Sequence, residues 1–281
     1  MMIAVYLIII LFATLAGATC GMGGGVIIKP LLDAISSYTT FQINLVSSIC
    51  VLAMALSSIV KHCIGKTKCL WKTAVCASMG SLIGGICGEF IFDAVRHQAT
   101  AAFGKSADYQ IKIIQNSVLA SLLVCVLIFM LVKKPKNVYE QSNKRVIAVF
   151  VCSCVLGIIS TFLGIGGGPI NVCVLCIAMK SNMKEVTLYS LLTIFWAQVA
   201  KHIKLVVTGG FTNNVVFDAS LTWWIMLVIA AVAVIGGIVG AIVNKKFPVK
   251  VVSCVYYAVI VLVIILNVYN IVINGIGLSK L

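Results

Sequence analysis

The residues best suited to binding a ligand are two glycine-rich stretches with the same pattern. Residues 21–25 read Gly-Met-Gly-Gly-Gly and residues 164–168 read Gly-Ile-Gly-Gly-Gly, each within a run of uncharged residues. Each glycine costs a helix interior roughly 1 kcal/mol relative to alanine, so both stretches are expected to break a helix. A helix that begins after such a break presents unpaired N–H groups and about half a positive charge. We therefore predict that a small anion binds backbone amides of the two breaks, at Gly23, Gly24, Gly25, Gly166, Gly167 and Gly168.

Polar side chains close to the breaks extend this predicted substrate site. Lys29 lies one turn past the first break and could add a full positive charge, while Asn171 follows the second break and could donate from its amide. Ser47 and Ser190 are 143 residues apart, the same separation as the two breaks, and their hydroxyls could bind an oxyanion. Further candidates follow each break along the chain: Gln42, Asn44, Ser48, Thr187, Thr193 and Gln198.

Each of these features also has a purely structural explanation. The glycines could only permit tight helix packing, and the Lys29 side chain could extend to the membrane interface. Serine and threonine commonly bond to their own helix backbone. The occurrence of two breaks at corresponding positions favours binding, because paired breaks of this kind point to the substrate site of a transporter.

Other kinds of chemistry have weaker support. Asp33 and Glu185 are the acidic residues closest to the segments after the breaks, and either could relay a proton. Cys173 and Cys176 have CxxC spacing, but the absence of a second pair or of nearby histidines disfavours a zinc or redox site. The sequence contains no phosphate-binding loop, HExxH motif or Ser/His/Asp arrangement. We expect no enzymatic activity, no cofactor and no metal, and transport that is secondary or channel-like.

The composition predicts an all-α polytopic membrane protein. Of the 281 residues, 62% are hydrophobic and only 10% are charged, and the mean hydropathy is +1.15. The net charge of +14 could suggest nucleic-acid binding in a soluble protein. Here the basic residues cluster in short loops between apolar runs, which is typical of the positive-inside bias, so we expect a lipid bilayer and no nucleic acid as partner. The chain is interpreted as a single membrane domain, 1–281, with multiple spans in the cell membrane.

The apolar runs define the expected spans. A helix needs about 20 residues to cross the hydrocarbon core. Two half-length helices are expected after the breaks, over 26–36 and 169–179. Trp71, Trp223-Trp224 and Tyr256-Tyr257 are interpreted as anchors at the membrane interface. Full spans are predicted over 3–20, 41–60, 73–91, 113–132, 147–163, 186–206, 219–244 and 251–273.

The two halves have the same plan, which indicates an internal duplication. The breaks match at an offset of 143 residues, and Gly84-Gly85-Ile86-Cys87-Gly88 matches Gly236-Gly237-Ile238-Val239-Gly240 at an offset of 152. We assign 1–135 to the first repeat, 136–146 to a cytoplasmic linker and 147–281 to the second repeat. Each repeat is expected to hold four full spans and one half-helix.

The positions of the basic loops predict the topology. The loops at 61–72, 133–145 and 244–250 should all be cytoplasmic. This requires an even number of crossings between the last two, which is met if the half-helix counts as a crossing. The halves would then be inverted repeats with both termini outside. If the half-helices are re-entrant instead, the halves are parallel and the loop at 244–250 violates the rule.

These paired motifs resemble the sulfite exporter TauE/SafE family, also called the toluene sulfonate uptake permease family. The similarity rests on Gly21–Gly25 with downstream Pro30-Leu31, on Gly164–Gly168 with Pro169, and on the duplication, and it covers essentially the whole chain. It implies a secondary transporter of sulfite, thiosulfate, sulfonates or related organic anions, which could be coupled to H⁺ or Na⁺. The alternatives are an anion channel, a carrier of organic anions without sulfur, and a structural membrane subunit.

Overall fold

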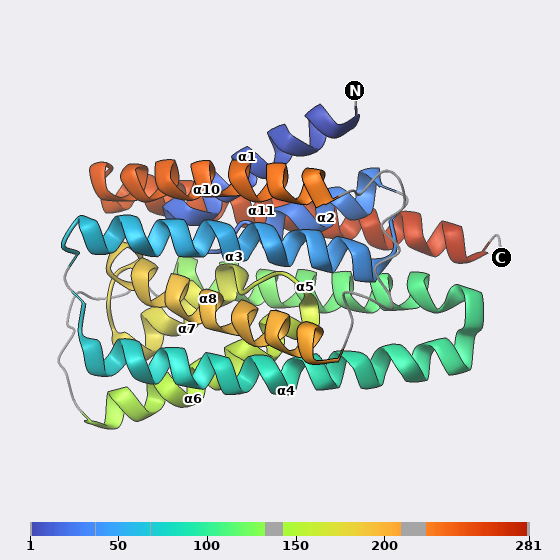
Figure 1. Ribbon diagram of the computed structural model, residues 1–281. Helices are drawn as coiled ribbons and strands as arrows, with labels where there is room; N and C mark the ends of the chain where they lie inside the picture. Colours follow the sequence, from blue (N-terminus) through green and yellow to red (C-terminus); the bar gives the residue numbers. More distant parts are fainter. Residues whose placement is uncertain (1, 37, 68, 133–142, 209–222, 280–281) are drawn as a thin grey trace.

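The computed structural model describes residues 2–36, 38–67, 69–132, 143–208 and 223–279. Over these residues the chain forms ten α-helices, one 3-10 turn and no strand (Figure 1). Most of the predicted linker and the start of the predicted span 219–244 lie outside the described residues. The helices are α1 (Met2–Cys20), α2 (Gly25–Ile35), α3 (Thr40–Ile64), α4 (Trp71–Phe103), α5 (Ala107–Val132), α6 (Asn143–Leu163), α7 (Gly168–Met179), α8 (Met183–Val207), α10 (Trp223–Lys246) and α11 (Val249–Ser279).

The predicted all-α membrane architecture is confirmed. Seven helices, namely α3, α4, α5, α6, α8, α10 and α11, are long and apolar enough to cross a membrane. The first predicted span is also helical, but its apolar part, Ala4–Cys20, is shorter than these seven. The two half-helices are α2 with 11 residues and α7 with 12, which at 1.5 Å per residue is about half a membrane thickness.

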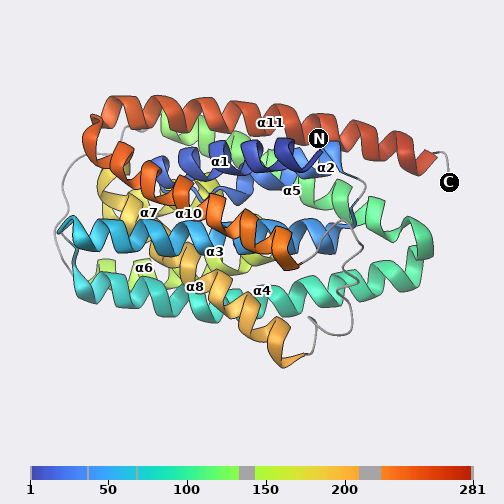
Figure 2. The same ribbon diagram turned by 45° about the horizontal axis from the view of Figure 1, so that its top comes forward.

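The long helices lie side by side along one axis (Figures 1 and 2). The connections α3–α4, α7–α8 and α10–α11 lie at one end of the bundle, which is on the left in Figure 1. Both chain ends and the α4–α5 connection lie at the other end. The helices α3 and α8 therefore run in opposite directions, as the inverted arrangement requires. Which end faces the cytoplasm stays a prediction from the basic residues near the left end, among them Lys66, Lys184 and Lys245.

Each half contributes one helical hairpin that turns back at a glycine break. α1 enters from the end that holds the termini, and α2 returns to that end, whereas α6 and α7 do the same from the opposite end (Figure 1). Glycine is required at these turns because Gly21, Gly23, Gly164 and Gly166 have φ between 67° and 73°. Side chains other than glycine rarely adopt this left-handed backbone conformation.

The glycines of α4 and α10 make corresponding close contacts in the two halves. A Cβ added at Gly88 of α4 would lie 2.5 Å from the Ile158 carbonyl oxygen of α6, and one at Gly240 of α10 would lie 2.6 Å from the Leu15 carbonyl oxygen of α1. These glycines are 152 residues apart and the carbonyls 143 apart, which are the two offsets found in the sequence. The contacts have the pattern that a duplication implies, while the duplication itself and the repeat boundaries stay predictions.

Candidate functional site

The two glycine breaks meet inside the bundle. A Cβ at Gly23 would lie 3.0 Å from the Gly166 carbonyl oxygen, and one at Gly25 would lie 2.8 Å from Ser47 Oγ and would contact the Ile165 carbonyl oxygen. Only glycine allows the backbones to approach this closely. The first turn of α2 begins at Gly25 and that of α7 at Gly168, with Pro169 placed where the missing N–H of proline is tolerated. Two helix N-termini, each with unpaired donors, are thus brought to one place.

Each break is covered by the helix that follows the other break. A Cβ added at Gly21 would lie 2.9 Å from the Cα of Thr187 on α8. A Cβ added at Gly164 would contact the side-chain amide of Asn44 on α3. Both pairs, Gly21 with Gly164 and Asn44 with Thr187, are separated by 143 residues. The two halves are therefore interlocked, since α3 packs on the second break and α8 on the first.

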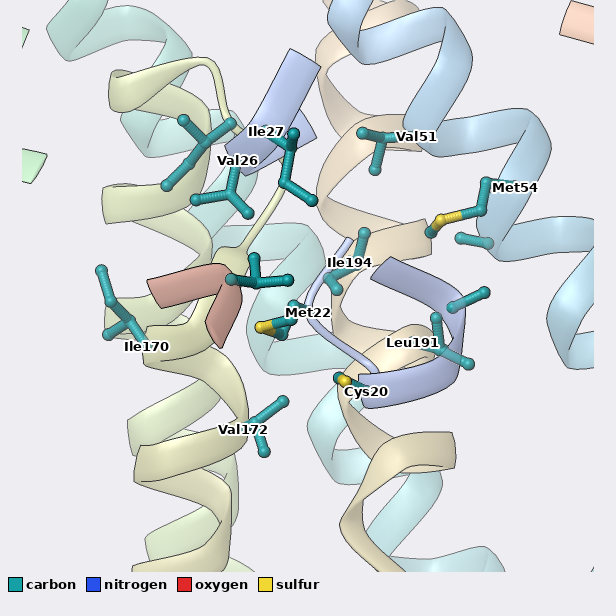
Figure 3. Close-up of a cluster of buried hydrophobic side chains, with 14 of the residues drawn as sticks. Cys20, Met22, Val26, Ile27, Val51, Met54, Ile170, Val172, Leu191 and Ile194 are labelled. Atoms are coloured by element: carbon teal, nitrogen blue, oxygen red, sulfur yellow. The ribbon is translucent and has the colours of Figure 1, made fainter. Parts of the chain in front are cut away.

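Apolar side chains fill the space around the meeting point. Met22 and Ile165, the second residues of the two motifs, are fully buried. Figure 3 shows Met22 on the first break close to Ile194 of α8. A Cβ added at Gly166 would contact Val51 of α3, and one added at Gly168 would contact Val26 of α2. We call Met22, Ile165, Val26, Val51 and Ile194 the apolar plug. In this structure the plug packs the breaks together, so an anion could reach their amides only if the plug residues moved apart.

The polar side chains predicted to bind the anion at the breaks differ in whether they already have hydrogen-bond partners. Ser47 Oγ is buried and has no hydrogen-bond partner among the described residues. Asn171 donates from Nδ2 to Thr193 Oγ1 at 3.1 Å, while its buried Oδ1 has no such partner. Ser190 donates to the Gly21 carbonyl oxygen at 2.6 Å. Ser47 and Asn171 therefore have hydrogen-bonding capacity to spare, whereas the Ser190 hydroxyl is already used to hold the first break.

Lys29 has a different environment from the one expected. It is only 2% exposed, so the alternative that its side chain extends to the membrane interface is wrong. Its Nζ donates to Gln115 Oε1 at 2.6 Å and to the Leu163 carbonyl oxygen at 2.5 Å. Gln115 in turn donates to the Phe162 carbonyl oxygen at 2.7 Å. The ammonium thus caps the C-terminal, partially negative end of α6, immediately before the second break.

Two polar cavities approach the breaks from opposite ends of the bundle. One, of about 410 Å³, lies between α3, α4 and α8, and we call it the α4 cavity. The other, of about 710 Å³, lies between the ends of α3, α7, α8 and α10, and we call it the α10 cavity. Asn44, which contacts Gly164, lines the α4 cavity, and Asn244, which donates to Thr187 Oγ1 at 3.3 Å, lines the α10 cavity.

A family model described as sulfite exporter TauE/SafE matches residues 6–268. The chain belongs to the sulfite exporter TauE/SafE family. Two curated relatives, each called probable membrane transporter protein MamO, come from Magnetospirillum gryphiswaldense and Paramagnetospirillum magneticum. Each is 32% identical over 103 residues, which is 37% of this chain and 16% of the relative. No solved structure matches.

Membership, together with the seven helices that are long and apolar enough to cross a membrane, makes this TauE/SafE protein a multi-pass membrane protein. The match with this chain covers only 16% of each curated relative, well under two thirds of its length. The names of the relatives therefore describe much longer proteins. Membership alone identifies neither the substrate nor the residues that bind it.

Several polar and aromatic residues of this TauE/SafE protein lie where the sequence did not place them. Tyr256, expected at the membrane interface, is fully buried and donates to the Pro169 carbonyl oxygen at 2.8 Å, so that interpretation is wrong. Asp33, one turn after Lys29, is buried, whereas Glu185 is exposed and lines the α10 cavity. The clearest omission is the charged cluster around Lys201 in the α4 cavity. A lysine within an apolar span was its only available signal.

Proposed function

We propose that this protein is a secondary transporter of small sulfur-containing anions of the sulfite, thiosulfate and sulfonate class. The observation that carries the proposal is the meeting of two glycine-led helix N-termini inside the bundle, with a cavity lined partly by polar side chains approaching from each end. Helix N-termini attract anions because their N–H groups and dipoles point towards the ligand. Family membership supports transport and the sulfite-like substrate class.

The anion would bind between the breaks through backbone amides of Gly23–Gly25 and Gly166–Gly168. Ser47 Oγ and Asn171 Nδ2 are the side-chain donors best placed to complete the site, because both side chains are buried next to the breaks. The Ser47 hydroxyl has no partner among the described residues, and Asn171 Nδ2 has a second N–H besides the one it donates to Thr193. Hydroxyl and amide N–H donors can bind an oxyanion without a permanent charge at the breaks. Lys29 would act from a distance, through its charge and its hold on α6.

The apolar plug favours a carrier over a channel. All five of its side chains are fully buried where the two breaks meet, as expected of a carrier that is closed at its centre. In the proposed cycle the anion enters one cavity, the hairpins α1–α2 and α6–α7 shift relative to α3 and α8, and the anion leaves through the other cavity. A coupling ion, H⁺ or Na⁺, would supply the driving force.

Uptake into proteoliposomes tests this function. The purified protein should take up ³⁵S-labelled sulfite or thiosulfate, and unlabelled anion on the inside should accelerate the entry of label, because a carrier exchanges its substrate. Flux that follows voltage alone and shows no such exchange would indicate a channel. Inhibition by carboxylates but not by sulfite, thiosulfate or sulfonates would reassign the substrate to organic anions without sulfur.

A further inference from the structure

The α4 cavity contains a charged cluster that the central site does not use. Its lining includes two carboxylates on α4, Glu89 and Asp93, and three cationic side chains, Arg96, Lys201 and Lys204. The side chains of Glu89, Lys201 and Lys204 are each no more than 10% exposed. Buried charges at membrane depth are costly, and they are retained mainly where they serve a function.

The ion pair between Lys201 and Glu89 is loose. Lys201 Nζ lies 3.7 Å from Glu89 Oε1, and that oxygen has no hydrogen-bond partner among the described residues. The same ammonium lies 3.4 Å from the Asn44 carbonyl oxygen, a long hydrogen bond. Lys204 is held more firmly, because it donates to the Glu89 carbonyl oxygen at 3.1 Å and pairs with Asp93. Lys201 is thus the buried cation with the weakest partners in this cavity.

Asn44 supplies a second, independent indication of a ligand. It is 2% exposed and lines the α4 cavity, yet neither its Nδ2 nor its Oδ1 has a hydrogen-bond partner among the described residues. A buried amide without partners is costly unless a ligand or water satisfies it. The same side chain contacts the position of a Cβ at Gly164, so a ligand bound to Asn44 would lie at the start of the second break.

We propose that the floor of the α4 cavity is a loading site for an oxyanion, bound by the Lys201 ammonium and the Asn44 Nδ2 donor. The Glu89 carboxylate pairs with the Lys201 ammonium when the site is empty, and the incoming anion displaces the carboxylate from the ammonium. Three cationic side chains face two carboxylates in this lining, so one monoanion neutralises the cluster. The identity of the anion as sulfite-like rests on the proposed function, whereas the site itself rests on Lys201, Asn44 and Glu89.

The corresponding positions in the other half lack this charge pair. The residue 143 positions before Lys201 is Ser58, and the residue 152 positions after Glu89 is Ala241. The α10 cavity therefore has no equivalent pair at these positions, and loading through a buried lysine is a property of one end of the bundle only.

Binding of sulfite and thiosulfate to the purified protein, measured by calorimetry and by thermal stabilisation, tests this site. Glu89→Gln removes the competing carboxylate and should tighten binding about tenfold, the effect of one charge-assisted contact. Lys201→Gln alone would leave the buried Glu89 carboxylate without this partner and could destabilise the fold. The double variant E89Q/K201Q avoids this problem because it removes both charges of the pair. It should bind about tenfold or more weakly than E89Q, and Asn44→Leu should also weaken binding. Lys72→Gln, at an exposed lysine on α4, is the charge-matched control and should bind like the unmodified protein.

The outcomes separate this inference from the proposed function. Equal dissociation constants for E89Q and E89Q/K201Q would overturn the loading site, and the function would still stand if uptake of labelled sulfite persisted. Binding that depends on Lys201 without any uptake would keep the site and overturn the transport proposal. If the unmodified protein and E89Q both fail to bind sulfite and thiosulfate, the loading site is overturned.

Discussion

The two glycine breaks have the same backbone plan, but the helix ends that precede them are capped by different chemistry. At the end of α1, the Thr19 carbonyl accepts from Asn244 Nδ2 at 2.6 Å and the Gly21 carbonyl accepts from the Ser190 hydroxyl. At the end of α6, the corresponding capping groups are the Gln115 amide and the Lys29 ammonium. Neutral donors hold one break, and a buried cation holds the other.

This difference separates the shape of the proposed site from its charge. The glycine positions and the helices packed on them correspond between the halves, so the enclosure for an anion is nearly symmetric. The charges are not symmetric, because Lys29 and the Lys201–Glu89 pair have no counterparts at the corresponding positions, Val172, Ser58 and Ala241. A transporter needs similar shapes to open at either end, whereas charge on one side can bias where the anion enters.

The largest expected effect comes from filling the meeting point of the breaks. Gly25→Ala places a Cβ 2.8 Å from Ser47 Oγ and against the Ile165 carbonyl, and it should lower the free energy of unfolding by about 3 kcal/mol. At the corresponding Gly168→Ala the nearest atom lies 3.3 Å away, so the main cost is the left-handed backbone, about 1–2 kcal/mol. Unfolding by denaturing detergent in mixed micelles measures both.

Gly275→Ala is the control for these substitutions, because nothing lies within 4 Å of its added Cβ and it lies inside α11. It should leave stability unchanged or slightly raised. If Gly168→Ala were as destabilising as Gly25→Ala, the two halves would meet more tightly on the α7 side than the distances indicate.

The next largest effect should come from the charged cap. Lys29→Met leaves the Leu163 carbonyl and Gln115 without their charged donor, and we expect a loss of about 2 kcal/mol in the free energy of unfolding. Asn244→Ala removes a neutral cap from the end of α1 and should cost about 1 kcal/mol. Lys72→Met, at an exposed lysine, should change stability by no more than about 0.5 kcal/mol. Equal losses for Lys29→Met and Asn244→Ala would mean that charge adds nothing to the cap.

The sequence was sufficient to predict the helices and the existence of the paired breaks. The expected half-helices 26–36 and 169–179 agree with Gly25–Ile35 and Gly168–Met179 to within a residue, because glycine and charge mark the ends of apolar runs sharply. The recurrence of the motif at a fixed offset also indicated that the breaks belong together. These features are local, or they repeat, and both can be read along the chain.

The partners of individual side chains could not be predicted in the same way. Lys29 reaches Leu163, 134 residues further on, and Lys201 pairs with Glu89 because α8 packs on α4. Which helix covers which break depends on the interlocking of the halves, and no spacing in the sequence specifies it. Tyr256 was assigned to the interface since tyrosine is common there, yet its place on α11 directs it at α7.

The smallest expected effect on stability compares the two corresponding serines. Ser190→Ala removes the 2.6 Å hydrogen bond to the Gly21 carbonyl and should lower the free energy of unfolding by about 1 kcal/mol. Ser47→Ala removes a hydroxyl that has no partner among the described residues, so it should change stability by less than about 0.5 kcal/mol. The same denaturation assay measures both variants.

If Ser47 binds the anion, Ser47→Ala should impair transport more than Ser190→Ala does, although it has the smaller effect on stability. Ser47→Ala should then raise the KM for sulfite about fivefold or more, the effect of one lost hydrogen bond to a charged group. Ser47→Thr keeps the hydroxyl and serves as the matched variant, provided that its stability is measured alongside. A Ser47→Ala protein with an unchanged KM would show that the free hydroxyl at the first break is left over from packing, and the substrate shell would then have to be sought at Asn171 and the second break.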